Sequence, residues 1–187
     1  MNVNIPNTLT LIRIGLMPVL VLVFYWPEFE NQHVVLASMF FFIGVTDLFD
    51  GYLARKLNQQ SAFGEFLDPV ADKITVSIAL VLIVSAHPGP IVAIPAAIII
   101  GRELTISALR EWMAIVGHNT DVKVNFIGKV KTAGQLWAVG FMLYEHPIGW
   151  FSPLHFGYIL LYISAALTLW SMITYLIAAW PNLGKDS

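Results

Sequence analysis

The chain has 187 residues and a net charge of −2, and 57% of its residues are apolar. Asp, Glu, Lys and Arg together make up only 12%, about half of the roughly 25% that is typical of soluble domains. This composition excludes a soluble globular domain, and it excludes a disordered chain, which needs low hydrophobicity and high net charge. Cysteine is absent, which excludes disulfides and thiolate zinc sites, and the near-neutral charge excludes the basic surface of a nucleic-acid-binding protein.

Six apolar windows are long enough for membrane-spanning helices, which need about 20 mostly apolar residues. The windows are continuously apolar rather than alternating, and this pattern favours helices over the strands of a membrane barrel. We therefore predict an all-α, polytopic membrane protein with six transmembrane helices, in which residues 1–187 form a single domain. The expected spans are Leu9–Trp26, Val34–Ala54, Phe66–Ala86, Ile91–Val116, Ile127–Tyr144 and Leu154–Ala178.

The basic residues are distributed asymmetrically along the chain. All ten Lys and Arg residues lie near the N-terminal entry, in or beside the second and fourth connections, or in the C-terminal tail. Under the positive-inside rule, this asymmetry places both termini and the even-numbered connections in the cytoplasm, in agreement with an even number of spans. The expected location is therefore the cytoplasmic membrane, which the chain crosses several times, with the functional site at the cytoplasmic face.

Four aspartates lie at the junction of the second and third expected spans. Asp47 and Asp50 are three residues apart and Asp68 and Asp72 are four apart, so each pair shares one helix face. A short hairpin would bring all four together, where a bound cation offsets their repulsion and partial burial. Oxygen ligands favour Mg²⁺ or Mn²⁺ over zinc, since Cys is absent and the five histidines are scattered as loop or interface residues. The alternative is that the aspartates are ordinary interfacial charges that cap helix ends.

Three further residues of this segment suit a ligand that contains phosphate. Gly51 has no side chain, so a phosphate or a nucleotide can come close to the backbone there. Arg55, one turn later, offers a planar fork for phosphate oxygens. Gly64 either lets the hairpin pack tightly or admits the substrate.

Taken together, these residues resemble the motif of the CDP-alcohol phosphatidyltransferase family. Every signature position is matched by the pattern Asp47-x2-Asp50-Gly51-x2-Ala54-Arg55-x8-Gly64-x3-Asp68-x3-Asp72. The resemblance implies six transmembrane helices, a centre with two metal ions, and a homodimer. It also implies transfer of a substituted phosphoryl group from a CDP-linked donor to an alcohol, with release of CMP.

The resemblance further implies roles for individual residues. Asp47, Asp50 and Asp68 are expected to be metal ligands, and Asp72 is expected to be both a ligand and the general base on the acceptor hydroxyl. The residues expected to contact the CDP-linked donor are Asp47, Gly51, Ala54, Arg55, Gly64 and, at the entry of the first span, Asn7. The alternative for Asn7 and its neighbours Thr10 and Arg13 is helix capping together with one interfacial charge.

A second set of polar residues bears on the acceptor. Arg102 and Glu103 lie well inside the fourth apolar window, and Arg110 lies about two turns later, roughly on the face of Arg102. A cation this far into a span is normally paired or functional. Arg102 therefore either pairs with an acid such as Glu103 or binds substrate.

Two lysines and a threonine open the fifth span. Lys129 and Lys131 are either interfacial anchors or part of a basic pocket that includes Thr132. A basic pocket beside the metal site suits an acceptor that carries its own phosphate, such as sn-glycerol 3-phosphate, and not inositol or choline. The residues predicted to bind the acceptor phosphate are Arg102, Arg110, Lys129, Lys131 and Thr132.

Several segments resemble, within this family, the enzymes that form phosphatidylglycerophosphate. They are NIPNTLTLIR, TDLFDGYLAR, FLDPVADK, RELTISALREW and IGKVKT. The resemblance implies transfer of the phosphatidyl group from CDP-diacylglycerol to sn-glycerol 3-phosphate. The alternatives are a cardiolipin synthase or a phosphatidylserine synthase of the same family, a divalent-cation transporter, and a non-catalytic lipid-binding or scaffold protein. Transporters typically contain inverted repeats with polar residues near the bilayer midplane. This sequence shows no repeat, and its acidic residues lie at one end of the expected spans.

Overall fold

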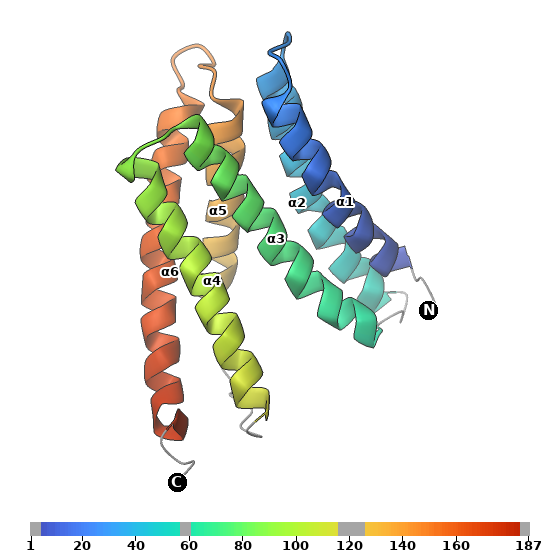
Figure 1. The fold of residues 1–187 in the computed structure, drawn as a ribbon, viewed down its shortest axis with the longest axis vertical. Helices are drawn as coiled ribbons and strands as arrows, with labels where there is room; N and C mark the ends of the chain where they lie inside the picture. Colours follow the sequence, from blue (N-terminus) through green and yellow to red (C-terminus); the bar gives the residue numbers. More distant parts are fainter. Residues whose placement is uncertain (1–4, 57–60, 116–125, 184–187) are drawn as a thin grey trace.

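The computed structural model describes residues 5–56, 61–115 and 126–183, and these residues form six helices and no strand (Figure 1). Several side chains within the helices lie outside the described part, including those of residues 47–55 and 126–131. The all-α class is therefore confirmed for the described residues. The helices are α1 (Ile5–Tyr25), α2 (Gln32–Lys56), α3 (Ala62–Ala86), α4 (Pro90–Ile115), α5 (Phe126–Tyr144) and α6 (Pro153–Leu183).

Each helix coincides with one expected span, but the helix ends differ from the ends of the apolar windows. α3 begins at Ala62, before its window, because the Ser61 side chain caps it by accepting a hydrogen bond from the Gly64 N–H at 3.1 Å. Within the described residues, four helices hold a stretch long and apolar enough to cross a membrane, and α2 holds a shorter apolar stretch, Gln32–Thr46. These features indicate a membrane protein, while six spans and the orientation of the termini stay predictions. The four long stretches are Asn7–Tyr25, Ala62–Ala86, Pro90–Met113 and Pro153–Ile177.

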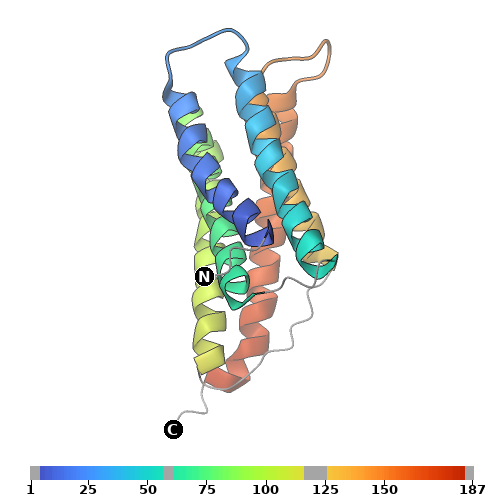
Figure 2. The ribbon, with the colours of Figure 1, turned by 90° about the vertical axis from the view of Figure 1, so that its right-hand side faces the viewer.

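The six helices run up and down between two ends of the bundle. We call the end where α1 begins, α2 ends and α3 begins the motif end, because the aspartate motif lies there, and the opposite end the loop end. The first, third and fifth connections gather at the loop end, while α6 ends on the same side as α1 begins (Figure 1). α3 lies between the α1–α2 pair and the α4–α6 group, and α2 packs beside α5 (Figure 2).

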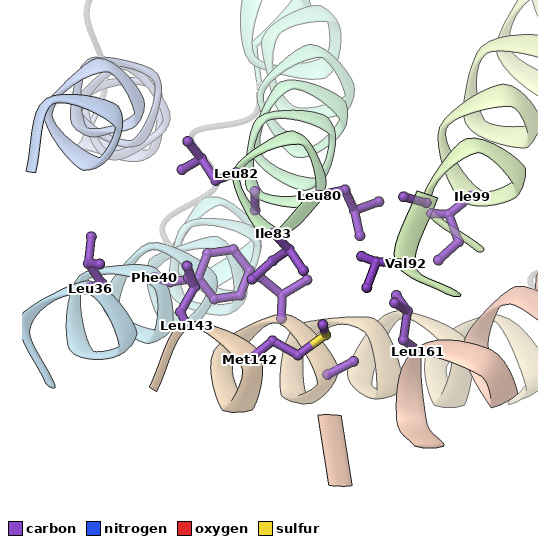
Figure 3. Close-up of a cluster of buried hydrophobic side chains, with 14 of the residues drawn as sticks. Leu36, Phe40, Leu80, Leu82, Ile83, Val92, Ile99, Met142, Leu143 and Leu161 are labelled. Carbon is purple, nitrogen blue, oxygen red and sulfur yellow. The ribbon is translucent and has the colours of Figure 1, made fainter. Parts of the chain in front are cut away.

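The buried core lies toward the loop end and contains residues of all six helices; Figure 3 shows part of it. Phe40 of α2, Ile83 of α3 and Met142 of α5 meet there, together with Val92 of α4 and Leu161 of α6. On the outside, no more than 33% of each apolar stretch is buried within the chain. Apolar surface of this extent suits contact with lipid. The polar residues of the motif end are thus separated from the core.

Glycines allow close approach at two helix contacts. A Cβ added at Gly157 of α6 would lie 2.5 Å from Met142 Cγ and 3.0 Å from the carbonyl oxygen of Ala138, both on α5. A Cβ added at Gly140 of α5 would lie 2.6 Å from two ring atoms of Phe41 on α2. Small residues commonly permit such approach between membrane helices. α5 is therefore packed closely against α2 on one side and α6 on the other.

A cavity of about 550 Å³ opens at the loop end. It is lined by residues of the α1–α2 and α5–α6 connections, among them Glu145, and by His33 and His146. The two imidazole rings are stacked, with centroids 3.8 Å apart. These histidines were expected as loop or interface residues, and the structure shows that they join the start of α2 to the α5–α6 connection.

The stacked pair leads to a prediction about acid stability. Burial and His146 lower the pKa of His33, which precedes the apolar run beginning at Val34, while Glu145 raises it. The folded state therefore favours neutral His33, and protonation of His33 destabilises it. The free energy of unfolding decreases for this reason as the pH falls through the lowered pKa. We expect the drop in Tm between about pH 7.5 and about pH 5 to be smaller for His33→Gln than for the wild type. Exposed His155 provides the control, since His155→Gln should retain the full drop; equal drops in all three proteins would contradict the prediction.

Candidate active site

Three polar residues follow one face of α1 near its start. Asn7, Thr10 and Arg13 are spaced three residues apart, and none is more than 4% exposed. Because α1 begins at Ile5, these residues lie within the helix. Asn7 bonds to Ser61, the N-cap of α3, and Thr10 bonds to Asp68 of α3, so they join two helices rather than cap α1. The entry of the first span therefore forms a polar wall of the site.

The start of α3 is fixed to this wall by a small hydrogen-bond network. Asn7 Nδ2 donates to Ser61 Oγ at 3.0 Å, and Ser61 Oγ donates to Asn7 Oδ1 at 3.2 Å. The same Ser61 oxygen accepts from the Gly64 N–H. A Cβ added at Gly64 would lie 2.6 Å from Asn7 Oδ1. Gly64 therefore allows close packing of α1 on α3, and its two expected roles, in packing of the hairpin and in admitting the substrate, stay predictions.

One turn further along α3, Asp68 meets the same face of α1. Thr10 Oγ1 donates a hydrogen bond of 2.8 Å to Asp68 Oδ1, and Asp68 is half-buried. No basic side chain of the described residues pairs with Asp68. Asp72, the next residue on this face, is exposed. A half-buried carboxylate whose partner among the described residues is a neutral hydroxyl fits a ligand of a divalent cation.

The other half of the aspartate motif lies outside the described side chains. Asp47 and Asp50, with Gly51, Ala54 and Arg55, belong to the last turns of α2, whose backbone ends at the motif end beside α1. The described residues alone contain no group of three or more acidic or histidine side chains able to hold a metal ion. Asp68 and Asp72 thus provide the described part of the predicted ligand set.

The arginines of α4 have partners of two kinds. Arg102 Nη1 donates to Glu103 Oε1 at 2.7 Å, which is the pairing that the sequence analysis kept as an alternative. Arg102 Nε is buried and has no hydrogen-bond partner among the described residues. Arg110 is exposed, and its guanidinium carbon lies 5.5 Å from the centroid of the Tyr175 ring of α6. This distance fits a cation–π contact.

The rest of the predicted basic pocket is only partly described. Thr132 is exposed on α5, whereas the side chains of Lys129 and Lys131 lie outside the described residues. Two residues near the site escaped the sequence analysis, Ser61 and Tyr175. A serine just before an apolar run is a signal for a helix N-cap, and it could have identified Ser61. No local signal exists for Tyr175, because its contact depends on the packing of α4 against α6.

Comparisons with known proteins identify the family of the chain. A family model described as CDP-alcohol phosphatidyltransferase matches residues 3–170. The chain belongs to the CDP-alcohol phosphatidyltransferase family. Like the family it belongs to, the chain is therefore an enzyme of the transferase class. The matched region of this chain includes both aspartate pairs.

Curated relatives cover nearly the full length of the chain. A protein of Pseudomonas fluorescens named CDP-diacylglycerol–glycerol-3-phosphate 3-phosphatidyltransferase is 47% identical over 184 residues, which cover 98% of this chain and 93% of the relative. Proteins of the same name from Salmonella choleraesuis (strain SC-B67) and Yersinia enterocolitica are 49% and 48% identical, and in both cases 98% of each chain is covered.

Proposed function

We propose that this chain transfers the phosphatidyl group of CDP-diacylglycerol to sn-glycerol 3-phosphate, giving phosphatidylglycerophosphate and CMP. The observation that carries the proposal is the identity of 47–49% with relatives of that printed name over 98% of the chain. Asp68 is half-buried and has no basic partner in the part of the chain that the structure describes, which supports a metal-dependent site at the motif end.

The proposed metal ligands are Asp47, Asp50, Asp68 and Asp72, which would hold two ions of Mg²⁺ or Mn²⁺. When bound, such ions would neutralise negative charge on the diphosphate of the donor and on the departing CMP. On the donor side, Arg55 would bind phosphate oxygens through its planar fork. The remaining proposed donor contacts are Asp47, Gly51, Ala54, Gly64 and Asn7.

Asp72 is the proposed general base. Its carboxylate would accept the proton of the attacking hydroxyl of sn-glycerol 3-phosphate as the oxygen forms a bond to the phosphorus next to the diacylglycerol. The bond between that phosphorus and the bridging oxygen of the diphosphate then breaks, and CMP leaves with both electrons. A carboxylate is a weak base, with an unperturbed pKa near 4, so positioning supplies much of the effect.

A basic pocket beside this centre would bind the phosphate of the acceptor. Arg110 is exposed and held against Tyr175, and Arg102 retains a buried Nε without a partner among the described residues. Guanidinium groups bind phosphate through two parallel hydrogen bonds. The proposed pocket contains Arg102, Arg110, Lys129, Lys131 and Thr132.

The proposed setting is the cytoplasmic membrane, with six spans, both termini in the cytoplasm and a homodimeric assembly. α1 begins and α6 finishes at the same end of the bundle, and this arrangement supports an even number of spans (Figure 1). Acyl chains of the donor could then stay in the bilayer while its diphosphate reaches the motif end.

An acceptor panel tests the proposed reaction. The detergent-purified protein is given CDP-diacylglycerol and Mg²⁺ or Mn²⁺, and CMP release is measured with sn-glycerol 3-phosphate, phosphatidylglycerol or serine. We expect release only with sn-glycerol 3-phosphate. Release with phosphatidylglycerol would indicate a cardiolipin synthase, and release with serine a phosphatidylserine synthase; no release with any acceptor would reject all three.

Arg110 provides a prediction about the acceptor. We expect Arg110→Gln to raise the KM for sn-glycerol 3-phosphate by about 10–100-fold, because a hydrogen bond to a charged group contributes about 1.5–3 kcal/mol. The KM for CDP-diacylglycerol serves as the internal control and should stay unchanged. Arg110→Lys should give an intermediate value, since it keeps the charge and loses the fork. A parallel rise in both KM values would contradict a role confined to the acceptor.

A further inference from the structure

The hydrogen bond between Thr10 and Asp68 links two helices at the motif end. Thr10 is completely buried, and its Oγ1 donates to Asp68 Oδ1 at 2.8 Å. The hydroxyls of Thr46, Thr105 and Ser107, in contrast, donate to carbonyl oxygens of their own helix four residues earlier. The Thr10 bond is different because it crosses to α3 and ends on a carboxylate. A hydrogen bond to an ionised acceptor is shorter and stronger than one between neutral groups.

Further contacts between α1 and the start of α3 lie beside this bond. One turn nearer the start of both helices, two hydrogen bonds between Asn7 and Ser61 hold α1 against the start of α3. The two helices are so close at Gly64 that a Cβ there would collide with Asn7 Oδ1. Since Thr10 follows Asn7 by three residues and Asp68 follows Gly64 by four, both contacts lie along the same seam. The Thr10 hydroxyl is therefore presented to Asp68 from a buried position on a part of α1 that is held against α3 by neighbouring contacts.

We infer that Thr10 is a positioning residue of the metal centre. Its hydroxyl occupies Oδ1 of Asp68 and thereby restricts rotation of the carboxylate, so that the oxygens are presented to a cation in one orientation. Groups that orient a metal ligand in this way typically change metal affinity by about 10–100-fold when they are removed. The inference rests on the proposed function, because it takes Asp68 to be a metal ligand.

Mn²⁺ binding to the substrate-free protein tests this role without using activity. Free Mn²⁺ is measured by electron paramagnetic resonance in detergent for the wild type, Thr10→Val, Thr10→Ser and Asp68→Ala. Valine has the shape of threonine without the hydroxyl, and serine keeps the hydroxyl. We expect Thr10→Val to weaken Mn²⁺ binding by about tenfold or more and Thr10→Ser to restore it to near the wild-type value.

Thr168→Val is the matched control. Thr168 is also completely buried, on α6, where its Oγ1 accepts from Gln135 Nε2 at 3.4 Å. This variant measures the general effect of replacing a buried hydroxyl by a methyl group, and it should bind Mn²⁺ as the wild type does. Should Thr10→Val not fold, Thr10→Cys takes its place, because a thiol is a weak donor of similar size; Mn²⁺ binding should then be weaker for Thr10→Cys than for Thr10→Ser.

The outcomes separate the inference from the proposal beneath it. If Asp68→Ala loses Mn²⁺ binding while Thr10→Val binds as tightly as the wild type, Thr10 does not position the ligand and the inference is overturned. If the wild type and Asp68→Ala bind Mn²⁺ equally, the assignment of Asp68 as a ligand fails instead. A second readout is the Mn²⁺ concentration needed for half-maximal CMP release, which should rise in Thr10→Val while the KM for CDP-diacylglycerol, measured at saturating Mn²⁺, stays constant.

Discussion

Replacement of Asp72 by asparagine is expected to slow CMP release by about 10²–10⁴-fold, because an amide cannot accept the proton of the acceptor hydroxyl. Asp72 is exposed at the motif end, one turn beyond Asp68 on the same face of α3, so it is accessible to a substrate. The rate is measured as kcat for CMP release with saturating sn-glycerol 3-phosphate. Binding of CDP-diacylglycerol, measured by titration of the same variant, should survive.

The control for Asp72→Asn is Glu111→Gln, which makes the same change of carboxylate to amide at an exposed position near the end of α4. Glu111→Gln should keep the wild-type rate. Asp68→Asn should lose Mn²⁺ binding together with turnover, because Asp68 is proposed as a metal ligand and not as the base. A near-normal rate for Asp72→Asn would rule out the base assignment, and loss of donor binding in this variant would indicate a role in the donor site instead.

The sequence predicted the helices well, because a membrane-spanning helix is specified locally by the length of its apolar run. It predicted their ends less well. Hydropathy marks where a helix can contact lipid, whereas caps mark where it begins, so Ser61 starts α3 before Phe66, the first residue of the apolar window. α6 likewise continues to Leu183, beyond the expected end at Ala178.

The candidate site could be predicted from spacing only within single helices. The pair Asp68 and Asp72 follows from the helical period, but the bond from Thr10 joins residues 58 positions apart. Such contacts depend on how helices pack, and apolar periodicity does not encode which faces meet. The pairing of Arg102 with Glu103 is a different case: adjacent residues on a helix do not face each other, and only the long Arg side chain makes the contact possible.

The contact between α5 and α6 should be sensitive to a single methyl group. We expect Gly157→Ala to destabilise the protein by about 1–3 kcal/mol, the usual effect of overpacking, which corresponds to a Tm drop of roughly 2–10 °C at this chain length. The added Cβ would meet the carbonyl oxygen of Ala138 at 3.0 Å and the backbone nitrogen of Met142 at 3.3 Å. Backbone atoms cannot move aside as a flexible side chain can, so the two helices must separate. Thermal unfolding followed by intrinsic fluorescence in detergent measures the effect.

Gly101 of α4 provides the matched control, because a Cβ added there meets nothing within 4 Å. Gly101→Ala should leave Tm unchanged or raise it slightly, since alanine is favoured over glycine within a helix by about 0.5–1 kcal/mol. Gly157→Val should lower Tm further than Gly157→Ala, because its side chain is larger. If the two alanine variants had the same Tm, close approach of α6 to α5 at Gly157 would not contribute to stability. The expected result is that Gly101→Ala keeps its Tm, Gly157→Ala has a lower Tm and Gly157→Val has the lowest. This order would show that Gly157 is required for close helix packing and not for its backbone flexibility.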